Sequence, residues 1–265
     1  MSSVLKYEGQ KFEKGSVTKV TDPLTVEQAL EISINGKPFT VVMQTPGDEL
    51  ELTIGLLYAE DVLKKDAQPQ LIEKRNKSGQ LDQMDVQIDS AELGEGFLSS
   101  RSLLSVSSCG ICGKLSLDDL EVSGDQLQSK ERFSVRDIQH FQEEMHKQQL
   151  KFIETGGSHA AAAFDINKNL LAIREDIGRH NAVDKVIGDL ILNGNHGKAK
   201  ALAVSGRVSY EIVSKAFRAK IPILAAVSAP SSLAIDFAKE YGMTLLGYCR
   251  KDKVTCYSNP WRITE

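Results

Sequence analysis

The sequence predicts an α/β protein whose N-terminal part is of the α+β type, and two observations carry this prediction. In the C-terminal half, apolar runs of the kind found in buried strands alternate with helical patterns, which is typical of a layered structure with a largely parallel sheet. In the N-terminal half, strands of alternating polarity surround a helical pattern. The 265 residues, 41% of them hydrophobic and 26% charged, are enough for one large or two small domains.

Local patterns predict the elements of the N-terminal half. Asn35-Gly36 between two alternating runs is the strongest short signal for a β-hairpin. In Thr45-Pro46-Gly47-Asp48, Thr45 can cap a helix and Pro46 suits its first position. We therefore predict a helix after this motif, strands at 30–34, 39–43 and 84–88, and a polar surface excursion over 64–82.

The C-terminal half shows a regular alternation of elements. Ser134 with Asp137 has the spacing of a capping box, and Ser231 is suited to an N-cap. We predict helices starting at 134, 182, 208 and 231, and strands at 164–166, 170–173, 201–204, 221–227 and 244–248. The chain then divides into an N-terminal tail (1–24), a smaller α+β domain (25–130) and an α/β domain (131–265).

Charge and hydropathy exclude some classes of function. The net charge of −4 does not favour bulk electrostatic binding of nucleic acid. No apolar run approaches the roughly 20 residues that span a bilayer, and the polar start of the chain is unlike a secretory signal. We therefore expect a cytoplasmic protein that binds neither nucleic acid nor membrane.

The run Ser108-Cys109-Gly110-Ile111-Cys112-Gly113-Lys114 carries the chemistry that is easiest to see. Its glycines let the backbone adopt positive φ and approach another surface, and Lys114 favours the nucleophilic thiolate. A zinc site would need Cys249 and Cys256, whose spacing is not that of a close ligand pair. A thioredoxin-like pair would open a helix, and a structural disulfide is unusual in the cytosol. A thiol pair for carrying or exchanging sulfur fits best.

Polar clusters follow the predicted strands at 155–159, 174–181, 205–207 and 228–232. Ligands of open α/β sheets bind beyond the carboxyl ends of the strands, where helix N-termini present N–H groups. Ser205-Gly206-Arg207 therefore predicts an anion cradle made of a hydroxyl, backbone donors and a guanidinium group. The dense segment 174–184 predicts ligand binding, a subunit contact or both.

These motifs together resemble the formate dehydrogenase accessory sulfurtransferases, the FdhD family, over about residues 25–260. The resemblance rests on the cysteine run and on further motifs in the same order, namely Thr45-Pro46-Gly47-Asp48-Glu49, Gly156-Gly157-Ser158-His159-Ala160-Ala161, Arg174-Glu175-Asp176-Ile177-Gly178-Arg179-His180-Asn181-Ala182-Val183-Asp184-Lys185, Ser205-Gly206-Arg207, Ser228-Ala229-Pro230-Ser231 and Gly247-Tyr248-Cys249-Arg250. The block that begins at Arg174 is the most specific of them.

The resemblance implies a sulfur relay. A cysteine desulfurase would load a persulfide onto Cys109, with Cys112 as second carrier or resolving thiol. The sulfur would then pass to a molybdenum (or tungsten) bis-guanine-dinucleotide pterin cofactor destined for formate dehydrogenase, carried as cargo by a homodimer. Expected cofactor contacts are Tyr248, Cys249, Arg250, Lys251, Asp252, Lys253, Ser205, Gly206, Arg207, His159 and Arg179. The roles of Asp176 and His180 stay open.

The resemblance also implies that the second half has a cytidine-deaminase-like, three-layer α/β fold. Zinc deaminases carry His-x-Glu and a later Pro-Cys-x-x-Cys, whereas this chain reads His159-Ala160-Ala161 with no later cysteine pair. We therefore expect no catalytic metal and no deamination. Two rival functions remain, a chaperone that holds the same cofactor without moving sulfur and a metal-binding regulatory protein that uses the four cysteines.

Overall fold

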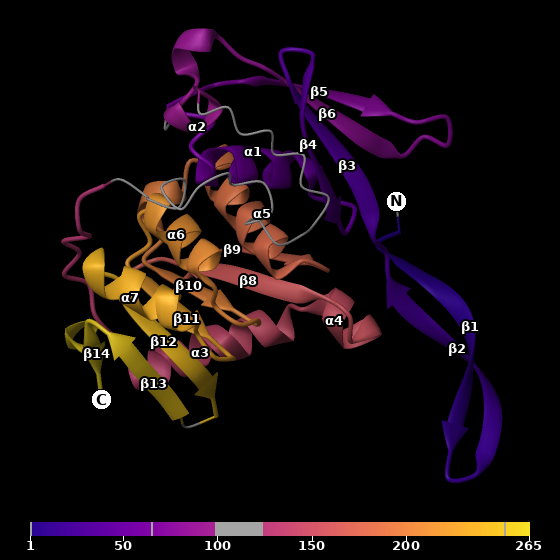
Figure 1. Ribbon diagram of the computed structural model, residues 1–265. Helices are drawn as coiled ribbons and strands as arrows, with labels where there is room; N and C mark the ends of the chain where they lie inside the picture. The colour runs from indigo at the N-terminus through magenta and orange to yellow at the C-terminus, as the bar shows by residue number, and fades with distance from the viewer. Residues whose placement is uncertain (1, 65, 99–123, 252) are drawn as a thin grey trace.

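The computed structural model describes residues 2–64, 66–98, 124–251 and 253–265 (Figure 1). The described chain forms a six-stranded sheet with helices on both faces, a four-stranded sheet with its own helix, and an N-terminal hairpin. The α/β prediction is thus confirmed. No helix in these ranges is long and apolar enough to cross a membrane.

The first two strands form a hairpin that projects from the body of the molecule (Figure 1). Strands β1 (Val4–Glu13) and β2 (Ser16–Thr25) pair antiparallel along their whole length. Most of their side chains are exposed. At the base of the hairpin, the hydroxyls of Thr25 and Thr155 lie 2.8 Å apart and join it to the C-terminal half. The segment expected as an N-terminal tail is therefore ordered as a hairpin.

The smaller sheet has the order β4-β3-β6-β5. Its strands are β3 (Gln28–Ile34), β4 (Lys37–Gln44), β5 (Gln70–Arg75) and β6 (Leu81–Gln87). Helix α1 (Glu49–Ala59) shares one apolar core with this sheet, and η1 (Ser90–Glu92) and α2 (Glu95–Leu98) follow. The predicted hairpin around Asn35 is confirmed, with Asn35 at φ +50° and Gly36 at +75°.

The larger sheet has the order β13-β12-β11-β10-β8-β9. Its strands are β8 (His159–Phe164), β9 (Leu170–Asp176), β10 (Ala201–Val204), β11 (Ile223–Ala226), β12 (Thr244–Arg250) and β13 (Lys253–Ser258). Only the neighbouring pairs β10–β11 and β11–β12 are parallel, whereas β8–β9, β8–β10 and β12–β13 are antiparallel. The sheet is mixed rather than largely parallel.

Helices cover both faces of the larger sheet. Helices α5 (Arg179–Leu192), α6 (Tyr210–Arg218) and α7 (Ser232–Glu240) share one core with one face. Helix α3 (Val135–Lys147) packs on the other face, followed by α4 (Leu150–Thr155). Short elements complete the chain, namely β7 (Phe133–Ser134), η3 (His196–Lys198), η4 (Pro260–Arg262) and β14 (Ile263–Thr264).

The two halves meet where α1 crosses α5, which lie side by side (Figure 1). A Cβ atom on Gly55 would lie 1.8 Å from the Asp184 carbonyl oxygen, and one on Gly188 would lie 1.9 Å from that of Glu51. The helices therefore touch backbone to backbone, which only glycine permits here. This contact explains why α5, expected to be amphipathic, is buried on nearly all sides.

Two of the predicted caps are confirmed and one is wrong. Ser134 and Asp137 form both bonds of a capping box, and the Ser231 hydroxyl accepts a hydrogen bond from the Ala234 N–H. Thr45 does not cap α1, whose N-cap is Asp48. Instead, the Thr45 hydroxyl accepts a hydrogen bond from the Ile177 N–H at 3.0 Å, because it is buried against the C-terminal half.

Candidate functional site

A cavity of about 550 Å³ opens at the carboxyl ends of the three parallel strands, beside α3 and the start of β8. Its wall includes five of the residues predicted as cofactor contacts, namely His159, Ser205, Cys249, Arg250 and Lys251. They come from three separate stretches of sequence, which the sheet gathers at one edge. This is where ligands bind in open α/β sheets.

His159 and Ser205 form the centre of the cavity's polar wall. His159 begins β8 and Ser205 follows β10, so the pairing of these strands brings them together. The Ser205 hydroxyl accepts a hydrogen bond from the Ala160 N–H at 2.9 Å and lies 3.3 Å from His159 Nδ1. Burial, reinforced by the positive charge of Arg179, lowers the pKa of His159 below its ordinary value of 6.5. The ring is therefore neutral at pH 7.

Two cationic residues lie near this pair, on either side of Gly206. A Cβ atom at Gly206 would lie 3.4 Å from both His159 Nδ1 and the Cβ of Arg179. Arg179 begins α5, and Arg207 is exposed immediately after the glycine. The charges of both arginines contribute to the lowered pKa of His159. The predicted anion cradle is thus surrounded by hydrogen-bond donors and positive charge, which favours phosphate groups.

The end of β12 forms the opposite wall through an irregularity in its pairing with β13, between Gly247 and Arg250. Tyr248 sits there at φ +53°, a conformation that non-glycine residues seldom adopt. As a result Cys249 turns inward and is buried, while Tyr248 is about half exposed and lies outside the cavity wall. Arg250 Nε donates to the Val227 carbonyl at 2.9 Å, which ties this cation to the end of β11.

Cys249 lines the cavity, but its thiol is unsuited to sulfur transfer. Burial raises the pKa of its thiol to about 12, so the thiol stays protonated at neutral pH. Only the thiolate is a good nucleophile. Of the other predicted contacts, Lys253 is exposed at the start of β13. Asp252, Cys109 and Cys112 lie outside the described residues.

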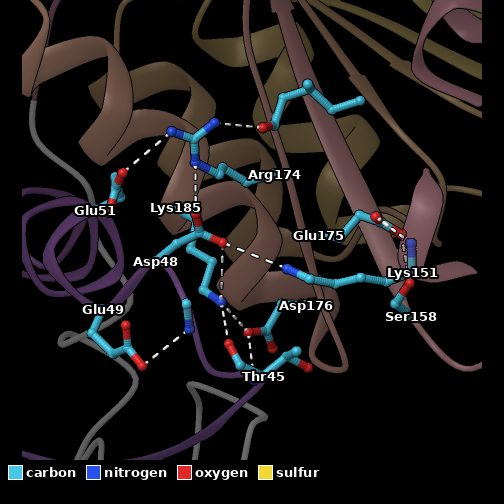
Figure 2. Close-up of polar contacts among 12 residues, drawn as sticks. Thr45, Asp48, Glu49, Glu51, Lys151, Ser158, Arg174, Glu175, Asp176 and Lys185 are labelled. Carbon is cyan, nitrogen blue, oxygen red and sulfur yellow. Dashed lines mark hydrogen bonds and ion pairs between the residues drawn. The ribbon is translucent and has the colours of Figure 1, made fainter. Parts of the chain in front are cut away.

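Glu175 shapes the cavity rim, although nothing in the sequence singled it out from its motif. Its carboxylate accepts hydrogen bonds at 2.8 Å from the backbone N–H groups of Lys151 and Phe152, at the start of α4. It also accepts one from the Ser158 hydroxyl at 2.7 Å (Figure 2). Ser158 and Phe152 line the cavity, so this carboxylate holds the 156–158 loop against it.

The 174–185 block binds the other half of the same chain. Asp176 Oδ2 contacts Lys185 Nζ at 2.8 Å and accepts a hydrogen bond from the Thr45 N–H at 2.9 Å (Figure 2). Lys185 Nζ donates to the Thr45 carbonyl at 2.6 Å, and Asn181 Nδ2 donates to the Met43 carbonyl at 2.7 Å. These contacts are intramolecular, which the alternatives of ligand or subunit binding did not include.

Arg174 extends this network toward α1. Its guanidinium group contacts Asp48 at 3.1 Å and Glu51 at 3.2 Å (Figure 2). It also contacts Asp189. We call Thr45, Asp48, Arg174, Asp176, Asn181 and Lys185 the interdomain network. Asp176 and Lys185 are both fully buried, and their polar atoms are paired.

A second buried cluster lies between α5 and α6. His180 Nε2 lies 3.0 Å from the Ser209 hydroxyl and 2.9 Å from a Glu211 carboxylate oxygen. Asp184 contacts Lys215 Nζ at 2.6 Å. Within the described ranges, no cluster of three or more His, Cys, Asp or Glu residues is suited to holding a metal ion.

The fold and the site thus define a class, an α/β protein with a cavity at the sheet's edge that carries cations in its wall, and with a second sheet whose helix packs on α5. The crystal structure of a protein from Desulfotalea psychrophila, which carries the description of a formate dehydrogenase accessory protein, shares this fold. It superposes with a TM-score of 0.80, covers 99% of this chain and 100% of its own, and is 23% identical.

Sequence comparison identifies the family. The model of the FdhD/NarQ family matches residues 25–264, so this chain belongs to that family. Among curated relatives, the sulfur carrier protein FdhD of Sulfolobus acidocaldarius is 38% identical over 261 residues, 98% of each chain. The sulfur carrier protein FdhD of Mycobacterium tuberculosis is 40% identical over 269 residues, 92% of each chain. The resemblance read from the motifs is confirmed.

Proposed function

We propose that this protein is a sulfur carrier of the formate dehydrogenase pathway. It accepts a sulfane sulfur from a cysteine desulfurase and passes it to a molybdenum or tungsten bis-guanine-dinucleotide pterin cofactor. The names of its relatives support the carrier role, and the likeness to a structure described as an accessory protein fits the pathway. Its partners would be the desulfurase, formate dehydrogenase and a second copy of the chain, in the cytoplasm.

The loading step is an exchange between sulfur atoms. The thiolate of Cys109 attacks the outer sulfur of the desulfurase persulfide, forming one S–S bond while the original S–S bond breaks. The desulfurase thiolate leaves, so no external oxidant is consumed. Cys112 is the second carrier or the resolving thiol. The glycines that flank both cysteines suit a carrier that must reach two partners.

In the delivery step, the two electrons come from the metal of the cofactor, which is the substrate. The sulfane sulfur becomes a sulfide ligand by taking two electrons from the reduced metal of the cofactor, and the carrier thiolate is released. Holding the cofactor on the same protein turns this encounter into a step within one complex, which raises the effective concentration of the carrier. The protein acts as a sulfurtransferase in this sense.

The observation that carries the proposal is the cavity at the carboxyl ends of β10, β11 and β12. A guanine dinucleotide pairs a flat base with a chain of phosphates. The surface of the cavity is largely apolar, the cations Arg250 and Lys251 lie in its wall, and Arg179 lies next to its rim residue His159. Such a division between apolar lining and a few placed polar groups is typical of small-molecule sites.

Mass spectrometry of the intact protein after incubation with a cysteine desulfurase and cysteine tests the proposal. We expect the wild type to gain one sulfur atom on the peptide that holds Cys109 and Cys112. Cys109→Ala should abolish or strongly reduce the gain, whereas the matched control Cys256→Ala should retain it. No gain with an active desulfurase would contradict the relay and leave the cofactor chaperone as the function.

A further inference from the structure

A second hollow, of about 300 Å³, lies between α1, the last turn of α5 and the 63–71 segment that leads into β5. Its wall is mostly apolar and includes Ile54, Leu63, Leu71, Ile191 and Leu192. Leu192 is 49% exposed and Lys64 is exposed as well, so the hollow opens to the surface. We call it the α1–α5 pocket. An open, concave apolar surface is typical of a site that takes an apolar group from a partner.

The segment that holds the two carrier cysteines departs from beside this pocket. Just before α2, the Gly94 N–H donates to the Val62 carbonyl at 2.9 Å. In the same ladder, the Lys64 N–H donates to the Glu92 carbonyl at 3.1 Å. Because Lys64 lines the pocket, the first anchor of the carrier segment is attached directly to the pocket wall.

The far end of the carrier segment returns to the same place. The described chain resumes at Gly124, where an added Cβ would lie 3.1 Å from the Phe217 ring in the last turn of α6. The next residue, Arg218, contacts Asp61 at 3.0 Å, and its carbonyl accepts a hydrogen bond from the Tyr58 hydroxyl at 3.0 Å. Tyr58 lines the α1–α5 pocket. Both anchors of the carrier segment therefore lie next to this pocket.

The cavity at the strand ends lies at the other end of α6. This helix begins at Tyr210, shortly after β10 and the cavity residue Ser205, and it ends at Arg218 beside the two anchors. A protein that takes the cofactor has to reach the cavity, whereas a protein that supplies sulfur has to reach the carrier cysteines. The α1–α5 pocket is therefore placed for the sulfur donor and not for formate dehydrogenase.

We propose that the α1–α5 pocket is the docking site of the cysteine desulfurase, which inserts an exposed apolar side chain into it during sulfur loading. This inference rests on the proposed function, which supplies the desulfurase as sulfur donor. Cys109 follows Leu98, the end of α2, by 11 residues, a length of chain that extends to about 35–40 Å at most. A desulfurase seated on the pocket is within this reach. A single apolar side chain buried in a pocket can dominate the energy of such an interface.

Desulfurase binding to the full-length protein, measured by biolayer interferometry, and the mass-spectrometric loading assay together test the proposal. Leu192→Asp places a charge at the exposed rim of the pocket. We expect it to weaken desulfurase binding about ten-fold or more and to slow loading at limiting desulfurase by a similar factor. Loading from glutathione persulfide, a small donor that needs no docking site, should proceed at the wild-type rate. With either donor the carrier thiolate forms the new S–S bond and the donor thiolate leaves.

Leu233→Asp is the matched control, because Leu233 is 51% exposed and lies on α7, outside the pocket wall. It should bind the desulfurase and be loaded like the wild type. Ala67→Trp is a second test, since Ala67 lines the pocket and a bulky side chain there would fill it without adding charge. It should cause the same loss, and it decides the question if the melting curve shows that Leu192→Asp does not fold.

The outcomes separate this inference from the proposed function. Wild-type binding and loading by both pocket variants would overturn the docking site and leave the pocket to another occupant. Slower loading from both donors would also overturn it, because the carrier itself would then be damaged. A wild type that takes sulfur from glutathione persulfide without binding the desulfurase would overturn the docking site and keep the carrier role. Desulfurase binding that Leu192→Asp weakens, with no persulfide formed from either donor, would contradict only the sulfur relay.

Discussion

The interdomain network and the cavity differ in how completely their polar groups are paired. In the network, both oxygens of Asp176 and the ammonium group of Lys185 are buried and have partners within the chain. In the cavity, Oε1 of Gln142 has no hydrogen-bond partner among the described residues, and Arg250 is exposed. Groups that are already satisfied hold the fold together, whereas unsatisfied groups are free to bind a ligand.

The comparison teaches that density of polar residues in a motif is a poor guide to chemistry. The 174–185 block is rich in charged and polar residues, yet several of its side chains join the two halves of the chain. The cavity draws on isolated residues from α3, β8, β10 and β12. Substitutions in the network should therefore affect stability, whereas substitutions in the cavity should affect binding.

The largest expected effect is on the network. Lys185→Met would leave the carboxylate of Asp176 buried without its cation, so we expect the free energy of unfolding to fall by about 3–5 kcal/mol. Urea denaturation measures the loss. Lys151→Met is the control, since its ammonium lies 3.7 Å from Asp48 and is partly exposed; it should cost less than about 1 kcal/mol. A similar, small cost for both variants would contradict the assigned role of the network.

A smaller loss of stability is expected where α1 crosses α5. The Cβ atom of Gly188→Ala would lie 1.9 Å from the Glu51 carbonyl oxygen, which forces the helices apart. We expect a cost of about 1–3 kcal/mol, measured by thermal unfolding. Gly197→Ala, whose added Cβ meets no atom within 4 Å, should be close to neutral. An unchanged melting temperature for Gly188→Ala would show that this contact is not tight.

Substitutions in the cavity wall should weaken nucleotide binding with little change in stability. Arg250→Ala removes a cation from the cavity wall, and we expect GDP to bind about ten-fold more weakly, the equivalent of one charge-assisted hydrogen bond. The free energy of unfolding should change by less than about 0.5 kcal/mol, because the side chain is exposed. Arg136→Ala, at an exposed position of α3, is the control. Equal binding by both variants would place the phosphates elsewhere.

The lowered pKa of His159 should make the stability of the protein depend modestly on pH. Its pKa is lowered in the folded protein, mainly by burial, so the unfolded chain binds this proton more readily. Its contribution to stability is therefore fully present above about pH 6.5, the pKa of an unfolded histidine, and is lost as the pH falls below that value.

The comparison of wild type with His159→Gln measures this contribution. The difference in the free energy of unfolding between them should shrink as the pH falls from about 7.5 to 5. The same comparison with His140→Gln, at an exposed position of α3, serves as the control. A difference that stays constant with pH would mean that His159 is not buried as described.

The smallest expected effect is none at all. The Cys249 thiol has a pKa raised to about 12 by burial, so it is protonated and unreactive near pH 7. Cys249→Ala should accept sulfur from the desulfurase at the rate of the wild type, as followed by mass spectrometry. A slower gain of sulfur would show that Cys249 takes part in the relay, contrary to its assignment as an unreactive residue of the cavity wall.

Much of the fold could be predicted because local patterns decide it. The continuous apolar run 201–204 is the strand β10 with the same bounds, and the capping box at Ser134 starts α3 as its spacing indicates. The hairpin at Asn35-Gly36 depends on two residues that tolerate positive φ. In each case the deciding interactions join residues that are close together in the sequence.

Part of the candidate site could also be predicted. The rule that ligands bind at strand ends pointed to His159 and Ser205, and the family resemblance pointed to Arg250 and Lys251; all four line the cavity. The cavity-lining role of Gln142 could not be predicted, because its spacing on α3 fits an ordinary helix position facing the core. The rim-shaping role of Glu175 was hidden in a motif in which Arg174, Asp176, Asn181 and Lys185 serve the interdomain network.

By itself the sequence determined the family, the hairpin at Asn35-Gly36, the caps at Ser134 and Ser231 and several strands, among them β10. Only the tertiary structure decided that the Thr45 hydroxyl binds the C-terminal half instead of capping α1. It also decided that the 174–185 block joins the two halves of the chain. It also decided which acceptor in the cavity stays unpaired. The physical reason is that local patterns specify which groups a residue carries. Whether those groups find partners depends on segments more than a hundred residues apart in the chain.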